Sequence, residues 1–352
     1  MKDFPSVGKI QDDFLKSHVF PSRGATRGEV FKGPKYGVDT SVVNISDSLS
    51  LISATDPASL IPTLGLKESA WLTVQLVASD IATAGCMPQY AQFCLNLPEY
   101  LTAEQFNEYW RWVSTWCEEL GVAITGGHTG KVQGQNSTVS GGATMFSCVE
   151  TNSVLTSDMA RPGDDLILLK EPAIISTSIL ALSFPETIKN ACGEEVMRKG
   201  QELFYESSAV KAAMDAVSLG VHTQGVRAMH DVTECGVVGA TIEMMMAAEC
   251  GVEIYRDKLV RGEAQQAIGD LFGYDPLYTI GAGALLVAVH PNHTERVVRS
   301  LTDKNYPVQM IGKVMPQEEG MYLIGNDKEL LEHPGTDPYW SVFFNSLKQG
   351  LK

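Results

Sequence analysis

Three aspartates from well separated parts of the chain carry the kind of side chain that binds a hard divalent cation. Asp39 lies in an alternating stretch, Asp80 near the end of an apolar helical stretch, and Asp231 after a short apolar run, while Asp56 before Pro57 is a fourth candidate. Magnesium takes a few carboxylates together with water and phosphate oxygens, so acids gathered from distant segments suit a nucleotide site better than a calcium cage. The alternative for each aspartate alone is a helix cap, a turn or a solvated surface position.

The stretch from Gly126 to Gln135, GGHTGKVQGQ, is the second candidate for chemistry. Its glycines lack the Cβ atoms that would keep a ligand away from the backbone, and His128, Thr129 and Lys131 offer polar tips to an anion or a metal. The spacing is not that of a Walker loop, because the first glycine of that motif and its metal-binding hydroxyl are missing. The stretch predicts a phosphate-binding loop, with a tight connection between two strands as the alternative.

The elements that must position these residues are predicted from hydrophobic periodicity and from helix signals. Alternation from Gly37 to Ile52 predicts a β-hairpin that has Asp39 inside its first strand. A helix is expected over roughly 68–84, where Gly85 ends it. Asp80 would lie in the last turn of that helix, where an acidic side chain opposes the helix dipole. Such a position is unfavourable unless the carboxylate binds another group, such as a cation.

A hinge is predicted at Arg161–Asp165, where proline and glycine precede a new apolar strand. With it, the chain divides into an arm over 1–35, a first domain over 36–160 and a second domain over 161–345. The second half alternates strands with helices, which indicates an α+β or α/β domain. A short acidic turn over 229–233 is expected to present Asp231 and Thr233 ahead of the next helix.

Composition and charge restrict the class of protein. The 352 residues carry a formal net charge of -15, so no basic stripe is available for a nucleic-acid backbone. The seven cysteines are odd in number and never form a C-x-x-C pair, which argues against a disulfide framework and a structural zinc site. The amino terminus lacks the apolar core of a secretion signal, and no apolar run reaches the length of about 18 residues that a membrane span needs. A cytoplasmic globular protein that binds no nucleic acid and no membrane is predicted.

Six segments in a fixed order make the chain similar to a known group of enzymes. They read GVDTSVV, ATDPASL, LVASDIATAGCMP, AITGGHTGKV, MHDVTECGVVGATIEM and LFGYDPLY. Together they resemble the aminoimidazole ribonucleotide synthetase superfamily, which includes selenophosphate synthetase, thiamine-monophosphate kinase and the hydrogenase-maturation ATPase. The likeness covers roughly residues 35 to 330. Its specificity comes from the ordered set, because each motif alone is weak.

The resemblance implies an α+β fold with ATP bound between two domains. The first would be an α/β domain whose strands pair with those of a second copy in a dimeric β-barrel, and the second would be α+β. In such proteins acidic residues matching Asp39, Asp80 and Asp231 hold magnesium. Catalysis of this kind rests on positioning and on charge neutralisation by metal and lysine, and it usually makes a poor leaving group into phosphate.

The resemblance also assigns roles around the nucleotide. Lys131 would neutralise phosphate charge, and His128 would either bond the phosphates or act as an acid or base. The residues expected to contact the nucleotide itself are Asp56, Gly126, Gly127, Thr129 and Thr233.

Departures from the relatives limit what the resemblance implies. The first motif has one acid, Asp39, where the family commonly has two. Selenophosphate synthetase carries a reactive Cys or Sec in its amino-terminal segment, whereas the first cysteine here is Cys86, so that activity is not expected. The layout most resembles the hydrogenase-maturation ATPase, but Gln349–Lys352 lacks its acceptor cysteine, so nitrile formation on its own tail is not expected. Glu234 and Cys235 stand where the relatives tend to have Gly or Arg, which leaves the acceptor unidentified.

The chain is therefore predicted to be an ATP- and magnesium-dependent homodimeric enzyme that activates a small molecule by phosphoryl transfer. Two alternatives remain open. One is a nucleotide-binding maturation or regulatory protein of the same fold without turnover of its own, and the other is a structural dimer in which the aspartates are incidental. ATP hydrolysis that requires Asp80 distinguishes the enzyme from the nucleotide-binding protein without turnover. Nucleotide binding of any kind excludes the structural dimer.

Overall fold

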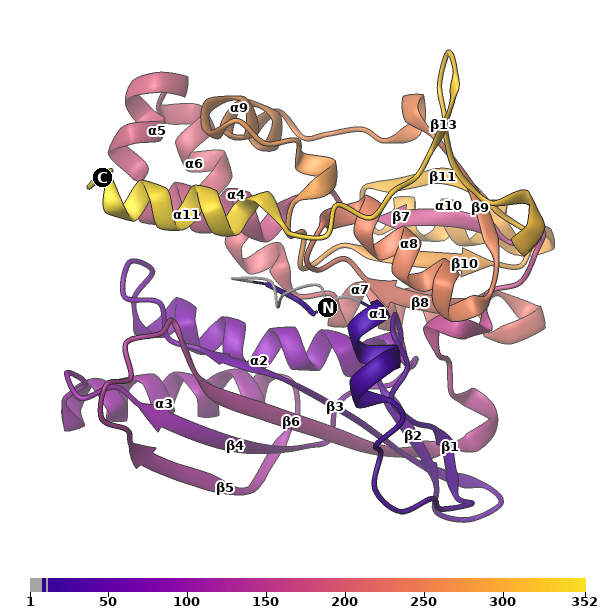
Figure 1. Cartoon of the computed structure of the whole chain (residues 1–352), viewed down its shortest axis with the longest axis horizontal. Helices are drawn as coiled ribbons and strands as arrows, with labels where there is room; N and C mark the ends of the chain where they lie inside the picture. Colours follow the sequence, from indigo (N-terminus) through magenta and orange to yellow (C-terminus); the bar gives the residue numbers. More distant parts are fainter. Residues whose placement is uncertain (1–7, 11) are drawn as a thin grey trace.

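The strands form two sheets, one in each half of the chain (Figure 1). The computed structural model describes residues 8–10 and 12–352. The strand order is β1-β2-β3-β6-β4-β5 in the first sheet and β13-β12-β9-β11-β7-β10-β8 in the second. Both halves also contain helices, so the predicted α+β fold with an amino-terminal and a carboxy-terminal domain is confirmed.

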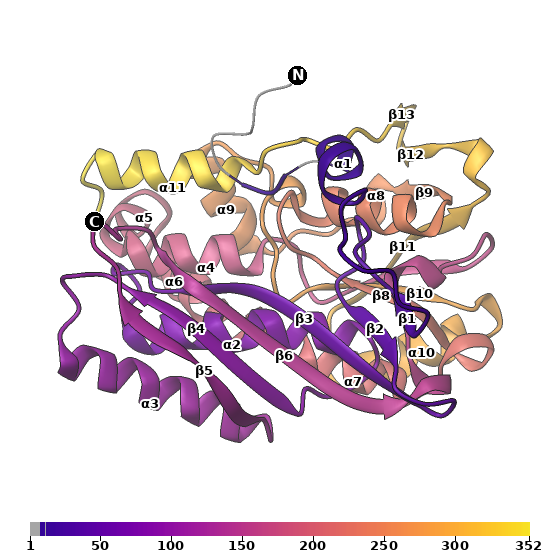
Figure 2. The same ribbon diagram turned by 60° about the horizontal axis from the view of Figure 1, so that its bottom comes forward.

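The first half is a sheet with two helices on one face. The elements in chain order are β1 (Val30–Lys32), β2 (Ser41–Asn44), β3 (Leu49–Ser59), α2 (Leu66–Thr83), β4 (Tyr90–Leu97), α3 (Ala103–Glu119), β5 (Ala123–Lys131) and β6 (Val139–Glu150). Strand β4 alternates buried and exposed side chains along its length, as a sheet covered on one face requires. Thr102 and Gln105 form a capping box at the start of α3. No element of the described chain covers the other face of this sheet (Figure 2).

The second half is a sheet between two layers of helices. Its elements include β7 (Asp165–Leu169), α7 (Val210–Val217), β8 (Val226–Asp231), α8 (Gly236–Ala248), β9 (Gly251–Tyr255), β10 (Leu285–Val289), α10 (Thr294–Asp303), β11 (Val308–Met315), β12 (Met321–Ile324) and β13 (Lys328–Leu330). One face of the sheet packs on α8, and the opposite face packs on α7 and α10. Beside the sheet lies a helical group whose apolar cluster also includes Leu72 of α2: α4 (Ile174–Ser183), α5 (Pro185–Cys192), α6 (Glu194–Glu202), α9 (Glu263–Phe272) and α11 (Pro338–Lys348).

Helix α2 joins the two halves, because it lies between the first sheet and the second half of the chain (Figure 1). Its buried side chains, among them Val74, Val77 and Ile81, belong to an apolar cluster that includes Phe93 of the first sheet and Val287 of the second. The two halves therefore share one continuous core along α2. The predicted boundary near residue 160 falls in the segment between β6 and β7.

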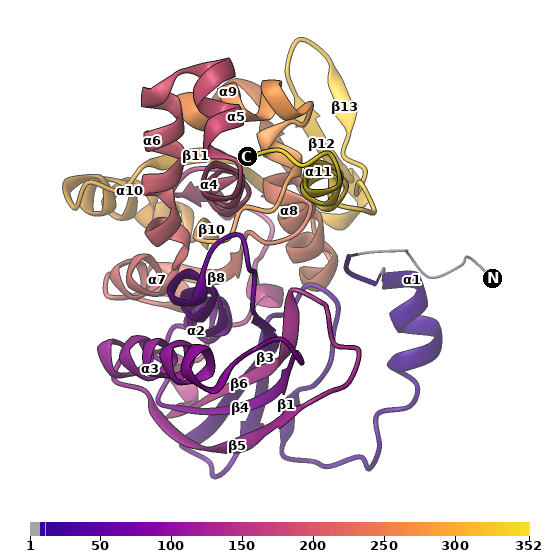
Figure 3. The same cartoon turned by 90° about the vertical axis from the view of Figure 1, so that its left-hand side faces the viewer.

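The amino-terminal segment runs along the side where the two halves meet (Figure 3). It contains the short helix α1 (Asp12–Phe14), followed by a π-helical turn over Leu15–Val19. The predicted arm over 1–35 is not separate throughout, since β1 pairs antiparallel with β2. Residues 1–7 and 11 of that arm lie outside the described residues.

Three local expectations were wrong. The glycine-rich stretch is not a loop up to Gln135, because β5 continues to Lys131 and pairs parallel with β4. Gly127 has a φ of +147°, and a Cβ there would lie 2.0 Å from the Phe93 carbonyl oxygen, so this glycine allows close strand pairing. Asp39 precedes β2, and β8 extends through Asp231 where a turn was expected.

Among the described residues, no helix combines the length and the apolar character that crossing a membrane requires. All seven cysteines are free thiols.

Candidate metal and nucleotide site

Four carboxylates from four different elements meet where the two halves join. Asp39 lies in the loop before β2, and Asp231 is the last residue of β8. Asp56 follows the buried Ile52 and Ala54 at every second position of β3, so its side chain points toward the helix-covered face. Asp80 is on α2, which packs against that face and also contacts β8.

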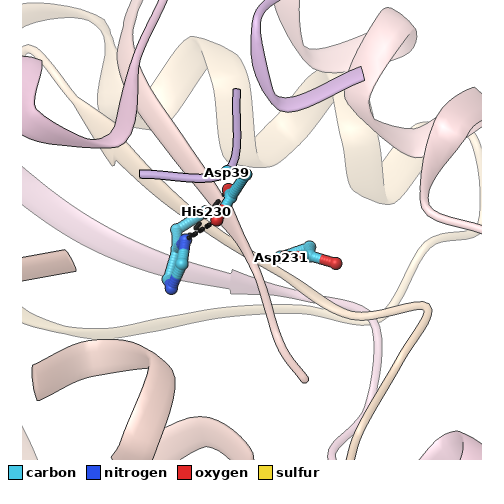
Figure 4. Close-up of side chains that lie close together, drawn as sticks. All are labelled: Asp39, His230 and Asp231. Carbon is cyan, nitrogen blue, oxygen red and sulfur yellow. Dashed lines mark hydrogen bonds and ion pairs between the residues drawn. The ribbon is translucent and has the colours of Figure 1, made fainter. Parts of the chain in front are cut away.

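Asp39, His230 and Asp231 form the tightest part of this cluster. One potential ligand atom from each lies within 4.8 Å of the other two. His230 Nδ1 is 2.7 Å from Oδ1 and 2.9 Å from Oδ2 of Asp39, which are the contacts drawn in Figure 4. His230 Nδ1 is already paired with the Asp39 carboxylate. The atoms of this cluster that could bind a metal ion are therefore carboxylate oxygens of the aspartates. The histidine therefore fits the role of a partner that orients a ligand carboxylate.

Burial, and after it repulsion from neighbouring carboxylates, raises the pKa values of three of these aspartates. Burial raises the pKa of Asp80 well above its usual value, and Asp231, Asp56 and Asp39 raise it further. Burial, followed by repulsion from Asp39, raises the pKa of Asp231 to about 8. Burial also raises the pKa of Asp56 to about 6, with a further contribution from Glu234. A divalent cation would remove this repulsion.

Lys9 is a site residue that the sequence did not reveal. Its attraction lowers the pKa values of Asp56, Asp80 and Asp231, against the dominant effect of burial. Its ammonium lies 2.7 Å from Oε2 of Glu243, a buried residue of α8. The stretch around Lys9 is mixed and charged, and the helix around Glu243 is otherwise apolar, so neither residue stood out in the sequence. The adjacency of His230 to Asp231 was the only signal pointing to the histidine.

The glycine-rich stretch lies away from these carboxylates within a single chain. It forms the edge strand β5, three strands from β3 in the sheet order, which is roughly 14 Å at the usual strand spacing. His128 and Thr129 are exposed, as are Gly126 and Gly127. Lys131 is exposed too, and its ammonium donates to the Glu99 carbonyl at 3.1 Å.

Thr233 lies in the turn between β8 and α8, on the carboxylate side. The structure thus brings Asp39, Asp56, Asp80 and Asp231 together with Thr233 just beyond them, whereas the residues of β5 are not part of that group in one chain.

Two family models cover most of the chain. The model for the N-terminal domain of AIR synthase related proteins matches residues 37–147, and the model for their C-terminal domain matches residues 161–323. The chain belongs to the AIR synthase related family. Asp39, Asp56 and Asp80 lie in the first matched range and Asp231 in the second, so the carboxylate cluster of this AIR synthase related protein is built from both family domains.

Individual members of the family are distant from this AIR synthase related protein. Carbamoyl dehydratase HypE from Escherichia coli is 24% identical over 268 residues, which cover 74% of this chain and 75% of that protein. Selenide, water dikinase from Methanocaldococcus jannaschii is 24% identical, with 72% of this chain and 74% of that protein covered. Subunit PurL of phosphoribosylformylglycinamidine synthase from the same organism is 26% identical over 48% of this chain, and the match spans only 22% of PurL.

Solved structures share the fold. Escherichia coli HypE superposes with a TM-score of 0.68 at 22% identity, covering 92% of this chain and 96% of that chain. Hydrogenase maturation protein HypE in complex with ATP superposes with a TM-score of 0.64 at 17% identity, covering 95% of this chain and 97% of that chain.

The raised pKa values predict that the metal-free protein loses stability as the pH rises. A carboxyl group with a raised folded pKa stabilises the fold fully below its unfolded value, and this contribution is lost as the pH rises through the folded value. That loss begins near the ordinary carboxyl pKa of 3.8 and is complete at about pH 6 for Asp56 and at about pH 8 for Asp231. Thermal unfolding in a chelator should therefore give a lower Tm at pH 8 than at pH 6. Added magnesium and, separately, Asp80→Asn should each flatten this dependence. An equally steep loss in Asp80→Asn would contradict the assignment.

Proposed function

We propose that this protein is an ATP- and magnesium-dependent enzyme that activates a small acceptor molecule by phosphoryl transfer. The observation that carries the proposal is the convergence of Asp39, Asp56, Asp80 and Asp231 from four elements at the seam between the two domains. One family relative is a dikinase by name, and one structure of the same fold contains ATP. Both support a nucleotide as the ligand of the carboxylates.

The donor set fits magnesium. Carboxylate oxygens are the hard ligands that this ion prefers, and it usually binds through a few of them together with water and phosphate oxygens. In our proposal Asp39, Asp80 and Asp231 hold the ion, and His230 keeps the Asp39 carboxylate in place. When bound, magnesium would neutralise charge on the nucleotide phosphates. The roles of Asp56 and Thr233 toward the nucleotide remain part of the proposal.

The test is calorimetric titration of the purified protein with a non-hydrolysable ATP analogue, with and without magnesium. Binding that requires magnesium supports the proposal, and phosphate release from ATP in the presence of candidate acceptors then identifies turnover. Magnesium-dependent binding without any turnover would favour the maturation or regulatory protein of the same fold. The absence of binding would contradict both.

The proposal includes a homodimer formed through the first sheet. The uncovered face of that sheet carries apolar side chains, since Tyr90 packs against Phe146 there and is 40% exposed. Exposed apolar groups on a sheet face are typical of an interface. If the first sheets of two copies joined in one closed barrel, neither sheet would keep a free edge. Strand β5 of one copy would then lie near the β1–β2 edge of the other, next to Asp39. His128 and Lys131 would then act on the partner's nucleotide.

A mixing experiment tests this arrangement. Lys131→Met and Asp231→Asn should each be inactive as homodimers. If each site takes Lys131 from one copy and Asp231 from the other, exchange of subunits should restore roughly a quarter of the parent activity, because half of the dimers are mixed and each has one intact site. Leu330→Asp, which changes an exposed side chain of β13, should not affect the dimer, whereas Tyr90→Asp should dissociate it. Mixtures that stay inactive although the subunits exchange would show that each site is built from one chain.

A further inference from the structure

Glu243 is an unusual residue for its place in the fold. It lies in the middle of α8, a helix whose other side chains are almost all apolar, and it is 1% exposed. Its two oxygens face donors from separate segments. The Tyr36 hydroxyl donates to Oε1 at 3.1 Å, and Lys9 Nζ lies 2.7 Å from Oε2. His333 Nε2 is 3.4 Å from Oε1.

The same carboxylate faces the metal site through His230, whose Nε2 is 3.6 Å from Oε2 and whose Nδ1 contacts Asp39. Burying a charge costs several kcal/mol unless it is well paired. The Glu243 carboxylate contacts Lys9, Tyr36 and His230, which lie in three separate segments. Such pairing of a buried charge indicates a specific role in holding these segments together. It fixes parts of the chain that are more than 200 residues apart in sequence.

Among the described residues, Lys9 contacts two acidic side chains of the second half. Besides the contact with Glu243, the backbone N–H of Lys9 donates to Glu234 Oε2 at 2.9 Å, in the turn that follows Asp231. The ammonium also lies 5.9 Å from the centre of the Tyr36 ring, within the range of a cation–π contact. This docking holds a positive charge beside the carboxylates of Asp39 and Asp231, which attract it.

We propose that Glu243 is a positioning residue that docks Lys9 on the carboxylate cluster, so that the Lys9 ammonium faces the phosphate groups of a bound nucleotide. The identity of the ligand rests on the proposed function, whereas the docking of Lys9 does not. A lysine is suited to this place because its ammonium is a compact charge on a flexible stem, which can stay anchored to Glu243 or turn toward a phosphate.

The experiment compares two pairs of variants with matched controls. Lys9→Met and Glu243→Gln remove the two partners, while Lys16→Met and Glu249→Gln make the same changes at exposed positions of the arm and of the end of α8. Hydrogen exchange at the backbone amide of Lys9 reports docking. Calorimetry with a non-hydrolysable ATP analogue and magnesium reports binding, and thermal unfolding reports stability.

Glu243→Gln should expose the Lys9 amide to exchange, and Lys9→Met should weaken binding of the analogue about tenfold, the value of a charge-assisted hydrogen bond. Lys9→Arg should restore most of the affinity. The double variant should bind no more weakly than the weaker single variant, because both act through one contact, whereas independent structural damage would add. The controls should match the parent in hydrogen exchange, in binding and in thermal unfolding.

Three results would overturn the inference, each in a different way. Unchanged exchange at Lys9 in Glu243→Gln would remove the docking role, and full affinity in Lys9→Met would remove the phosphate role. If the parent protein binds no nucleotide, the proposed function fails and the phosphate role fails with it, while exchange still decides the docking. If Glu243→Gln does not fold, Lys9→Met and Lys9→Arg decide between a phosphate contact and none.

Discussion

Replacing Asp231 by asparagine is expected to abolish magnesium-dependent binding of ATP. The carboxylate lies at the end of β8, within 4.8 Å of the ligand atoms of Asp39 and His230, so it is central to the cluster. Loss of residues that only support metal ligands already costs 10–100-fold in affinity or activity, so loss of a ligand should cost about 100-fold or more. The measurement is the difference in analogue affinity with and without magnesium.

The matched control is Asp303→Asn, which removes an exposed carboxylate at the end of α10. It should bind like the parent. Burial and then repulsion from Asp39 make the Asp231 carboxylate costly to keep ionised in the metal-free protein, so Asp231→Asn is expected to have a higher Tm in a chelator while it fails to bind. An Asp231→Asn protein that keeps its magnesium-dependent affinity would show that the metal site lies elsewhere.

Replacing Gly37 by alanine is expected to be the most damaging small change near the site. Gly37 has a φ of +74°, and a Cβ built there would lie 2.1 Å from the backbone carbonyl oxygen of Glu243. The loop that carries Asp39 therefore rests directly on α8. Alanine must both adopt the left-handed region and push this loop away from the helix, for an expected loss of about 4 kcal/mol or more in the free energy of unfolding.

Gly24→Ala separates these two effects. Gly24 also has a φ of +74°, but a Cβ there meets nothing within 4 Å. Its loss should be about 1–2 kcal/mol, the cost of the left-handed conformation alone. Urea unfolding measures the free energy of unfolding of both variants. The difference between their losses is the part that comes from the contact with Glu243. Equal losses in the two variants would show that the loop can move away from α8 without penalty.

The parts of the fold that local rules control were predicted well from the sequence. The helix expected over roughly 68–84 is present as α2 over Leu66–Thr83, because its apolar periodicity and the glycine that follows it are local signals. The glycine-rich stretch was misjudged, since glycine disfavours strands in general but permits the close pairing that Gly127 makes with β4.

The convergence of the site could not come from spacing. Asp39, Asp80 and Asp231 meet only because α2 lies between the two sheets, and that packing is long-range. Only the resemblance to a family predicted that these three aspartates share one metal site. The resemblance gave no sign of Lys9 and Glu243, because their partners are defined by tertiary contacts between the first residues of the chain and α8.

The core shared along α2 bears on how the protein folds. Val77 and Ile81 of this helix are buried in the same cluster as side chains from both sheets, so each half relies on the other to bury the side chains of this cluster. The two family domains are thus joined by shared apolar packing along α2. Rigid rotation of one half against the other would break this core, so access to the carboxylates depends on the segments that border them.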